Sequence, residues 1–175
     1  MSILIGYSSC EGQSYKIAQH IAKQLSGEPI KWFCLDHPEQ WLEATAEDKI
    51  LLVASIRYGV FRPALHRYIR RFEDRLQSIP SAFVGVCLTA RKPGKDDPER
   101  SVYMIHLAKK HHWQPSIRRM FAGALQYSRY NWWQTKLIQL IMKITGGSID
   151  TSVDIEFTDW NKVDTFALEL KQLFR

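Results

Sequence analysis

Hydrophobic positions along the chain form short continuous runs that alternate with stretches of helical spacing. The runs are residues 2–8, 30–35, 49–55, 81–88, 118–125 and 153–157. Uninterrupted apolar runs of this length are typical of strands buried on both faces of a parallel sheet. Between them, Ile17 and Ile21 recur at the spacing of one helical face, and Pro63 stands near the start of another helix. Further helices are expected before Trp113 and over residues 159–174.

Strands that alternate with helices predict βαβ units, and hence an α/β three-layer sandwich whose parallel sheet has helices on both faces. The runs 118–125 and 153–157 share the last strand position, so the six runs make five positions. Five positions in 175 residues leave no room for a second domain. We therefore expect a single domain over residues 1–175. Residues 126–147 depart from the alternation, because they separate two strand-like runs. We expect them to form a long excursion within the last strand position, or a lid.

The composition is that of an ordinary globular protein, with 45% hydrophobic and 24% charged residues. No run reaches the roughly 18 apolar residues of a membrane span. The first residues lack the basic segment of a secretory signal, so a cytoplasmic location is expected. Cys10, Cys34 and Cys87 are odd in number and widely spaced, which favours reduced thiols in that compartment.

The net charge of +6 and the pI near 9.3 are unusual. A basic surface attracts nucleic acid, anionic lipid headgroups or acidic small molecules, but it can also be a solvated face without a partner. Nucleic acid is not expected, because no zinc-finger spacing, RNA-recognition aromatic motif or tandem basic helix occurs. No metal site is expected, because the histidines lack ligand spacing and the adjacent His111 and His112 would point about 100° apart on a helix.

The first apolar run ends in the hydroxyl-rich loop Ser8–Ser14, and a helix follows. Ligands of open α/β sheets bind at the carboxyl ends of the strands, where the strand order reverses. The hydroxyls of Ser9 and Ser14 and the N–H groups of the helix start suit an anion, and Gly12 lets the backbone approach it. The loop lacks the motifs of P-loop and dinucleotide folds, which argues against ATP and NAD. By itself, it is equally compatible with a capped helix start.

Two further loops follow buried strands. In the run Ser55-Ile56-Arg57-Tyr58-Gly59, an aromatic residue beside a glycine can stack on a planar ring, although Tyr58 could also cover the core and Arg57 could form a surface salt bridge. The segment Leu88-Thr89-Ala90-Arg91 emerges from the next strand. Because the carboxyl ends of parallel strands meet at one edge of a sheet, we expect all three loops to converge on one crevice.

Six stretches of the chain resemble the flavodoxin-like, menaquinone-dependent protoporphyrinogen IX dehydrogenases of bacterial haem biosynthesis. They are Gly12-Gln13-Ser14, Ala54-Ser55-Ile56-Arg57-Tyr58-Gly59, Ala90-Arg91-Lys92-Pro93, Ala122-Gly123-Ala124-Leu125, Leu140-Ile141-Met142-Lys143 and Thr158-Asp159-Trp160. The loop Ser8–Ser14 is similar to the flavodoxin phosphate loop, commonly T-x-x-G-x-T, with serines in place of threonines. The chain departs from the family at Cys10-Glu11, where a basic–acidic pair is usual, and it ends soon after the last expected helix.

The resemblance implies a flavodoxin-like sheet with strand order 2-1-3-4-5, FMN as cofactor, and oxidation of protoporphyrinogen IX to protoporphyrin IX in three two-electron steps with a membrane quinone, menaquinone or ubiquinone, as acceptor. The residues implied at the cofactor are Ser9, Cys10, Glu11, Gly12, Gln13, Ser14, Ser55, Ile56, Arg57, Tyr58, Gly59, Leu88, Thr89, Ala90 and Arg91. Arg57 and Tyr58 are the candidate catalytic residues, because Arg57 would stabilise an anionic reduced flavin and so raise its potential. The resemblance identifies no general base.

Residues 132–144, within the insertion, have an amphipathic pattern. At 100° per residue, Lys136 and Lys143 share one narrow side of a helix, and Trp133 lies with the aliphatic residues on the broad opposite side. The residues expected at a membrane or substrate are Trp132, Trp133, Lys136, Leu137, Leu140, Ile141 and Lys143. Tryptophans, a wide apolar face and lysines without acids are typical of a helix on an anionic membrane, so peripheral attachment to the inner face of the cell membrane is expected. Packing on its own domain, quinone access and a lid over the tetrapyrrole stay open as alternatives.

Two other functions stay open. A flavodoxin-type electron carrier would have an acidic surface and no amphipathic insertion, whereas this chain carries a net charge of +6, which suits a tetrapyrrole with two propionates. An NAD(P)H quinone reductase needs a pyridine-nucleotide site, which no motif in the sequence indicates.

Overall fold

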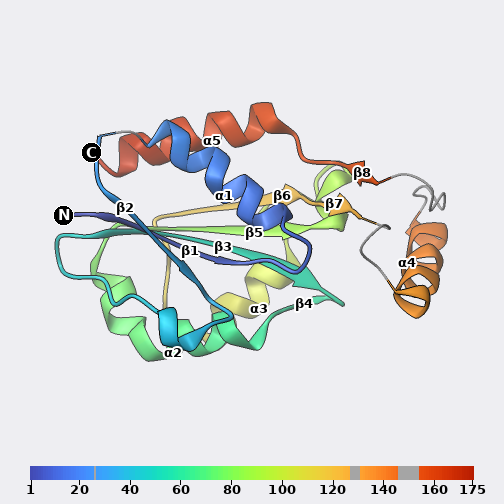
Figure 1. Cartoon of the computed structure of the whole chain (residues 1–175), viewed down its shortest axis with the longest axis horizontal. Coiled ribbons are helices and arrows are strands. Elements are labelled where there is room, and N and C mark those ends of the chain that lie inside the picture. Colours follow the sequence, from blue (N-terminus) through green and yellow to red (C-terminus); the bar gives the residue numbers. More distant parts are fainter. Residues whose placement is uncertain (26, 127–130, 146–153) are drawn as a thin grey trace.

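The computed structural model describes residues 1–25, 27–126, 131–145 and 154–175 (Figure 1). Its main sheet contains the parallel strands β1 (Ile3–Ser8), β2 (Ile30–Cys34), β3 (Lys49–Arg57), β5 (Ser81–Cys87) and β6 (Ile117–Ala122). They lie in the order β2-β1-β3-β5-β6, and the short strand β4 (Val60–Phe61) pairs antiparallel with β3. The predicted order 2-1-3-4-5 is therefore confirmed.

Helices cover both faces of the sheet (Figure 1). On one face lie α1 (Gln13–Gln24) and α5 (Trp160–Leu173), and on the other lie α2 (Pro63–Ser78) and α3 (Val102–Lys110). Two short 3-10 turns, η1 (Pro38–Gln40) and η2 (Leu88–Arg91), lie in the connections. The Asp159 side chain caps α5 by accepting the N–H groups of Asn161 and Lys162 at 3.1 and 3.3 Å.

The buried strands explain the uninterrupted apolar runs of the sequence. Along β3, Leu51 and Val53 pack into the core beneath α1 and α5, whereas Ile50 and Leu52 pack into the core on the other face. All four side chains are fully buried. Because successive side chains of a strand point to opposite faces, a strand between two helical layers has no polar face to present.

The insertion begins and ends at a small antiparallel ribbon. In this ribbon, β7 (Ala124–Leu125) pairs with β8 (Ile155–Glu156), and Leu125 is opposite Ile155. The apolar run 118–125 is thus broken at Gly123, whose N–H donates to the carbonyl of Cys87 at 3.2 Å and whose carbonyl accepts the N–H of Phe157 at 3.1 Å. Between the ribbon strands in the chain comes α4 (Trp132–Thr145), which lies beyond the end of the main sheet (Figure 1).

Candidate functional site

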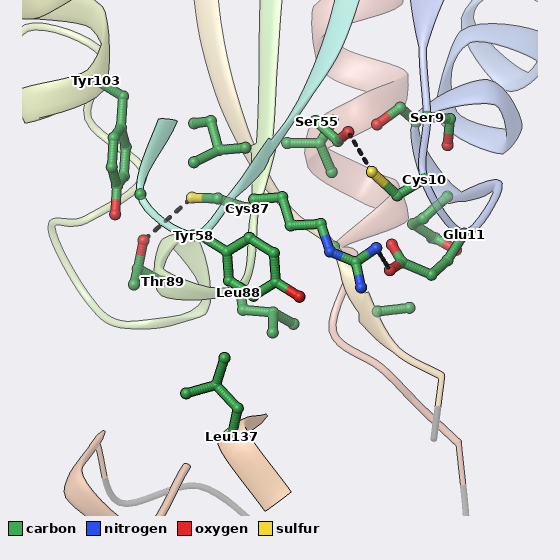
Figure 2. A pocket seen from close by; sticks show the side chains of 18 residues that line it. Ser9, Cys10, Glu11, Ser55, Tyr58, Cys87, Leu88, Thr89, Tyr103 and Leu137 are labelled. Carbon is green, nitrogen blue, oxygen red and sulfur yellow. Dashed lines mark hydrogen bonds and ion pairs between the residues drawn. The ribbon is translucent and has the colours of Figure 1, made fainter. Parts of the chain in front are cut away.

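A cavity of about 440 Å³ opens at the carboxyl ends of β1, β3, β5 and β6 (Figure 2). This volume falls within the range of small-molecule and cofactor sites. The three predicted loops converge on it, and the predicted residues that line it are Ser9, Cys10, Glu11, Gln13, Ser14, Ser55, Ile56, Arg57, Tyr58, Gly59, Leu88 and Thr89. The cavity therefore lies at the edge of the sheet where the strand order reverses between β1 and β3.

The loop after β1 is shaped to bind an anion. Gly12 adopts a left-handed conformation (φ 95°) at the start of α1, and its N–H donates to Ser9 Oγ at 3.0 Å. Ser14 is only 1% exposed, lines the cavity, and its hydroxyl has no hydrogen-bond partner in the described part of the chain. A buried hydroxyl without a partner is uncommon in native proteins, and one at a helix N-terminus suits an anionic oxygen.

The side chain of Gln13 holds this loop to the rest of the fold. Its amide Nε2 donates to Thr158 Oγ1 at 2.8 Å, and the Thr158 hydroxyl donates to the carbonyl of Ala122 at 2.7 Å. Gln13, Thr158 and Ala122 are all buried. The start of α1 is thereby fixed to the end of β6 and the approach to α5.

An ion pair connects the first loop to the second. Arg57 Nη1, at the end of β3, donates to Glu11 Oε1 (the dashed line at Glu11 in Figure 2). The Arg57 guanidinium also lies 5.3 Å from the centre of the Tyr58 ring. Burial lowers the pKa of Arg57, but hydrogen bonds to Tyr58 and Cys10 and the charge of Glu11 outweigh it, and the net shift is upward. Arg57 is therefore a permanent cation at the cavity.

A second guanidinium lies beside the first loop. Arg62 Nη1 donates to Cys10 Sγ at 3.6 Å, and Arg62 Nε lies 3.2 Å from Asp36 Oδ1. Asp36 in turn accepts the Ser8 hydroxyl at 3.0 Å. The Cys10 thiol also lies 3.9 Å from the hydroxyl of Ser55, so the loop contacts the ends of both β1 and β3.

Tyr58 presents an aromatic ring at the cavity. Tyr58 is 53% exposed, and its backbone is left-handed (φ 52°), which is uncommon for a residue other than glycine. Gly59 follows with φ 81°, so the turn changes direction over two residues. Backbone strain of this kind is found preferentially at ligand sites. An exposed ring held in this way can stack on a flat ligand.

The third loop is held mainly by its own contacts. Cys87 Sγ lies 3.1 Å from Thr89 Oγ1, and burial raises the pKa of the Cys87 thiol. Arg91 Nη1 donates to the carbonyl of Leu88 at 2.8 Å, and its guanidinium lies 5.4 Å from the centre of the Phe157 ring. Of the predicted cofactor residues, Gly12, Ala90 and Arg91 contribute no lining to the cavity.

Several lining residues were not anticipated from the sequence: Val86, Cys87, Tyr103, Gly123 and Ala124. Gly123 and Ala124 directly follow β6, so the rule that ligands bind at carboxyl ends of strands would have pointed to them. Tyr103 reaches the cavity from α3, and no sequence signal marks it.

Helix α4 contributes one of its described residues to the lining of the cavity. Leu137 lines the cavity from α4 (Figure 2). The other described residues expected at a membrane or substrate are exposed: Trp132, Trp133, Lys136, Leu140 and Lys143. The side chain of Ile141 lies outside the described part of the chain. Within the described ranges, no helix is long and apolar enough to cross a membrane, and no three metal-binding side chains cluster.

The flavodoxin domain family matches residues 4–152 of the chain. The chain is 36% identical to the "Protoporphyrinogen IX dehydrogenase [quinone]" of Escherichia coli (strain K12) over 178 residues, which covers 99% of this chain and 96% of that protein. It is 39% identical over 172 residues to a protein of the same name from Leishmania major, covering 97% of this chain and 74% of the relative.

Two solved structures are similar in fold. Oxidised Flavodoxin 1 from Bacillus cereus matches with a TM-score of 0.55 and 16% identity, covering 99% of this chain and 97% of the flavodoxin. The azoreductase from Bacillus anthracis str. Sterne matches with a TM-score of 0.53 and 8% identity, covering 99% of each chain. At these identities the similarity concerns the fold alone.

Proposed function

The chain belongs to the flavodoxin domain family and, within it, to the quinone-linked protoporphyrinogen IX dehydrogenases, and we propose that it is an FMN enzyme that oxidises protoporphyrinogen IX to protoporphyrin IX with a quinone as acceptor in haem biosynthesis. The observation that carries the proposal is the cavity onto which the three predicted loops converge, in a chain 36% identical to such a dehydrogenase over almost its full length.

The residues of the cavity fit FMN. The Ser14 hydroxyl, which has no hydrogen-bond partner among the described residues, and the N-terminus of α1 suit its terminal phosphate. The exposed ring of Tyr58 suits its flat isoalloxazine. When bound, the flavin supplies an acceptor for the electrons of the tetrapyrrole and a donor to the quinone. Ser9 and Ser14 would hold the phosphate, and the backbone of Ile56 and Leu88 would border the ring.

The chain's own residues would also prepare the site for an anionic, apolar substrate. The permanent charge of Arg57 favours electron-rich states of a neighbouring ring. Leu137 and Val86 cover part of the cavity with apolar surface, which keeps water away from the reacting atoms. The net charge of +6 attracts a substrate that carries two propionates.

We further propose that α4 attaches the protein peripherally to an anionic membrane. Trp132, Trp133 and Leu140 are exposed on the same helix as the exposed Lys136 and Lys143. Aromatic and aliphatic side chains beside lysines suit the boundary between headgroups and acyl chains. Because a quinone is dissolved in the membrane, a helix that contacts both membrane and cavity would bring the acceptor close to the flavin.

An anaerobic assay tests the proposed activity. Purified protein is loaded with FMN and mixed with protoporphyrinogen IX, with and without a soluble menaquinone analogue. We expect porphyrin absorbance and fluorescence to grow over many turnovers only when the quinone is present. A parallel reaction contains NAD(P)H in place of protoporphyrinogen IX. Reduction of the flavin by NAD(P)H alone would favour a quinone reductase, and reduction by neither donor would favour an electron carrier. Either result would contradict the proposal.

A further inference from the structure

A carboxylate occupies the loop to which the flavin phosphate is assigned. Glu11 stands between Ser9 and Ser14, lines the same cavity, and its side chain is only 21% exposed. A phosphate monoester carries roughly 1.5 to 2 negative charges at neutral pH. Two anions at a partly buried site repel each other more strongly than they would in water. An uncompensated Glu11 would therefore oppose the ligand that the rest of the loop is shaped to bind.

Arg57 supplies the compensating charge. Its guanidinium comes from the second loop, 46 residues away in sequence, and donates to Glu11 Oε1. The pair is partly buried, with side-chain exposures of 25% and 21%, so water screens it less than a surface pair. The neighbouring cation, Arg62, pairs with Asp36 at 3.2 Å and donates to the thiol of Cys10 at 3.6 Å. Arg57 is thus placed to neutralise the acid of the anion-binding loop.

We propose that Arg57 serves the phosphate end of the flavin site by neutralising Glu11, and that the Glu11–Arg57 pair sets the preference of this protein for FMN over flavins without a phosphate, an inference that rests on the proposed function. Arg57 then acts on the ring as one member of an ion pair with Glu11. Loss of Arg57 alone removes a cationic partner of Glu11 and so strengthens the repulsion between its carboxylate and the phosphate. Loss of both charges restores neutrality and should restore the affinity for FMN.

A double-mutant cycle read with two ligands tests this inference. The full-length apoprotein is prepared as wild type, Glu11→Gln, Arg57→Gln and the double variant. The dissociation constants of FMN and of riboflavin, which lacks the phosphate, are measured from the quenching of flavin fluorescence. Riboflavin reports contacts to the ring, so the ratio of the two constants isolates the phosphate end.

We expect Arg57→Gln to weaken FMN binding by roughly 10- to 100-fold, the scale for removal of one partner from a partly buried charge pair, and riboflavin binding by less than about threefold. Glu11→Gln should bind FMN at least as tightly as wild type, and the double variant should recover most of the loss. The penalty in Arg57→Gln should shrink as ionic strength rises, because added salt screens the exposed part of the repulsion.

Two sets of variants guard against a folding artefact. Arg57→Lys keeps the charge, so its ratio of FMN to riboflavin affinity should remain close to that of wild type. Arg119→Gln and Glu169→Gln break a more exposed Arg–Glu pair, 2.5 Å apart and outside the cavity, and should change neither constant. Circular dichroism checks that each variant is folded.

Equal weakening of both flavins by Arg57→Gln, or no recovery in the double variant, would overturn the inference, as would a ratio in Arg57→Lys as low as in Arg57→Gln. If the wild-type protein binds FMN and shows no coupling, only this inference fails. If the wild-type protein binds neither flavin, the proposed function fails with it.

Discussion

At the scale of single residues, the hydroxyl of Ser14 combines complete burial with the lack of a partner in the described structure. If a phosphate oxygen is its partner, Ser14→Ala should weaken FMN binding by about 1–3 kcal/mol, and the same change at Ser9 should add to the loss. The stability of the apoprotein should change little, because no protein hydrogen bond is lost at Ser14. Fluorescence titration measures the first effect and thermal unfolding the second. Ser78→Ala on the exposed end of α2 is the matched control.

The charge of Arg57 and the ring of Tyr58 should be detectable in the flavin itself. Arg57→Ala should lower the two-electron reduction potential, because an electron-rich flavin loses a nearby cation. A tenfold loss of preference for the reduced form corresponds to about 30 mV. Tyr58→Ala should change the flavin absorption spectrum if the ring stacks on it. A potential that is unchanged in Arg57→Ala would assign Arg57 to the ion pair alone.

A pair of histidines, one in α2 and one at the end of α3, should make stability depend on pH. His66 Nδ1 lies 2.9 Å from His111 Nε2, and burial, followed by the charges of Lys110, His111 and Arg70, lowers the pKa of His66 to about 4. Below about pH 6.5 the unfolded chain takes up a proton that the folded His66 refuses. The contribution of His66 to the free energy of unfolding should therefore be fully present above pH 6.5 and be lost progressively between pH 6.5 and 4.

The variant His66→Asn should flatten this fall by on the order of 1 kcal/mol, since the site is partly exposed and the shift is screened. Part of the dependence should persist, because burial also lowers the pKa of His111. Thermal unfolding between pH 8 and pH 4 measures both proteins. A parallel decline in the two would show that His66 does not contribute.

Individual site residues were predictable where their position in the chain fixes their place in the fold. Ser9 and Leu88 directly follow buried strands, Ser55 lies near the end of another, and parallel strands bring their carboxyl ends together. The partnership of Glu11 with Arg57 was not predictable, because it depends on the side-chain directions of two loops 46 residues apart. Periodicity and motif carry no such information.

At the scale of elements, the continuous apolar runs and the spacing of helical faces were sufficient for the main sheet and its helices. They did not resolve the ends of the insertion, since β7 and β8 are two residues each and pair across the whole insertion. Strands this short have no period to detect. The helical projection placed Leu137 with the apolar residues of α4, but only the folded chain shows that it faces the cavity while Trp133 and Leu140 are exposed.

The exposed tryptophans of α4 lead to a test of membrane attachment. The double variant Trp132→Ala/Trp133→Ala should bind anionic vesicles at least tenfold more weakly, because it loses the apolar surface that would enter the headgroup region. Its FMN affinity should be unchanged, as neither residue lines the cavity.

Co-sedimentation with vesicles containing phosphatidylglycerol measures the binding, and neutral phosphatidylcholine vesicles show the contribution of Lys136 and Lys143. Trp41, which is part of the domain's packing, is unsuitable as a control, whereas exposed Trp32→Ala on β2 is suitable. Retention of full binding by the double variant would contradict the attachment.

At the scale of the whole molecule, two parts with different roles can be distinguished. The main hydrophobic clusters lie on the two faces of the sheet, and no described residue of α4 belongs to them. Leu125, which precedes the insertion, pairs with Ile155 in the β7–β8 ribbon. The three loops at the cavity follow β1, β3 and β5, which lie outside the insertion. The fold and the cofactor site should therefore be separable from residues 126–147.

Deletion of residues 126–147, with a short Gly/Ser joint in their place, tests this separation. The shortened protein should unfold within a few degrees of wild type and bind FMN with similar affinity, since its cores and loops are intact. It should lose binding to anionic vesicles and turnover with a membrane-embedded quinone, because α4, the helix proposed to contact the membrane, and Leu137 are absent. Turnover with a water-soluble quinone analogue should fall less, which distinguishes lost membrane access from a damaged flavin site. If the shortened protein does not fold, the insertion is part of the scaffold. If it folds and still reduces the membrane quinone, α4 has another role.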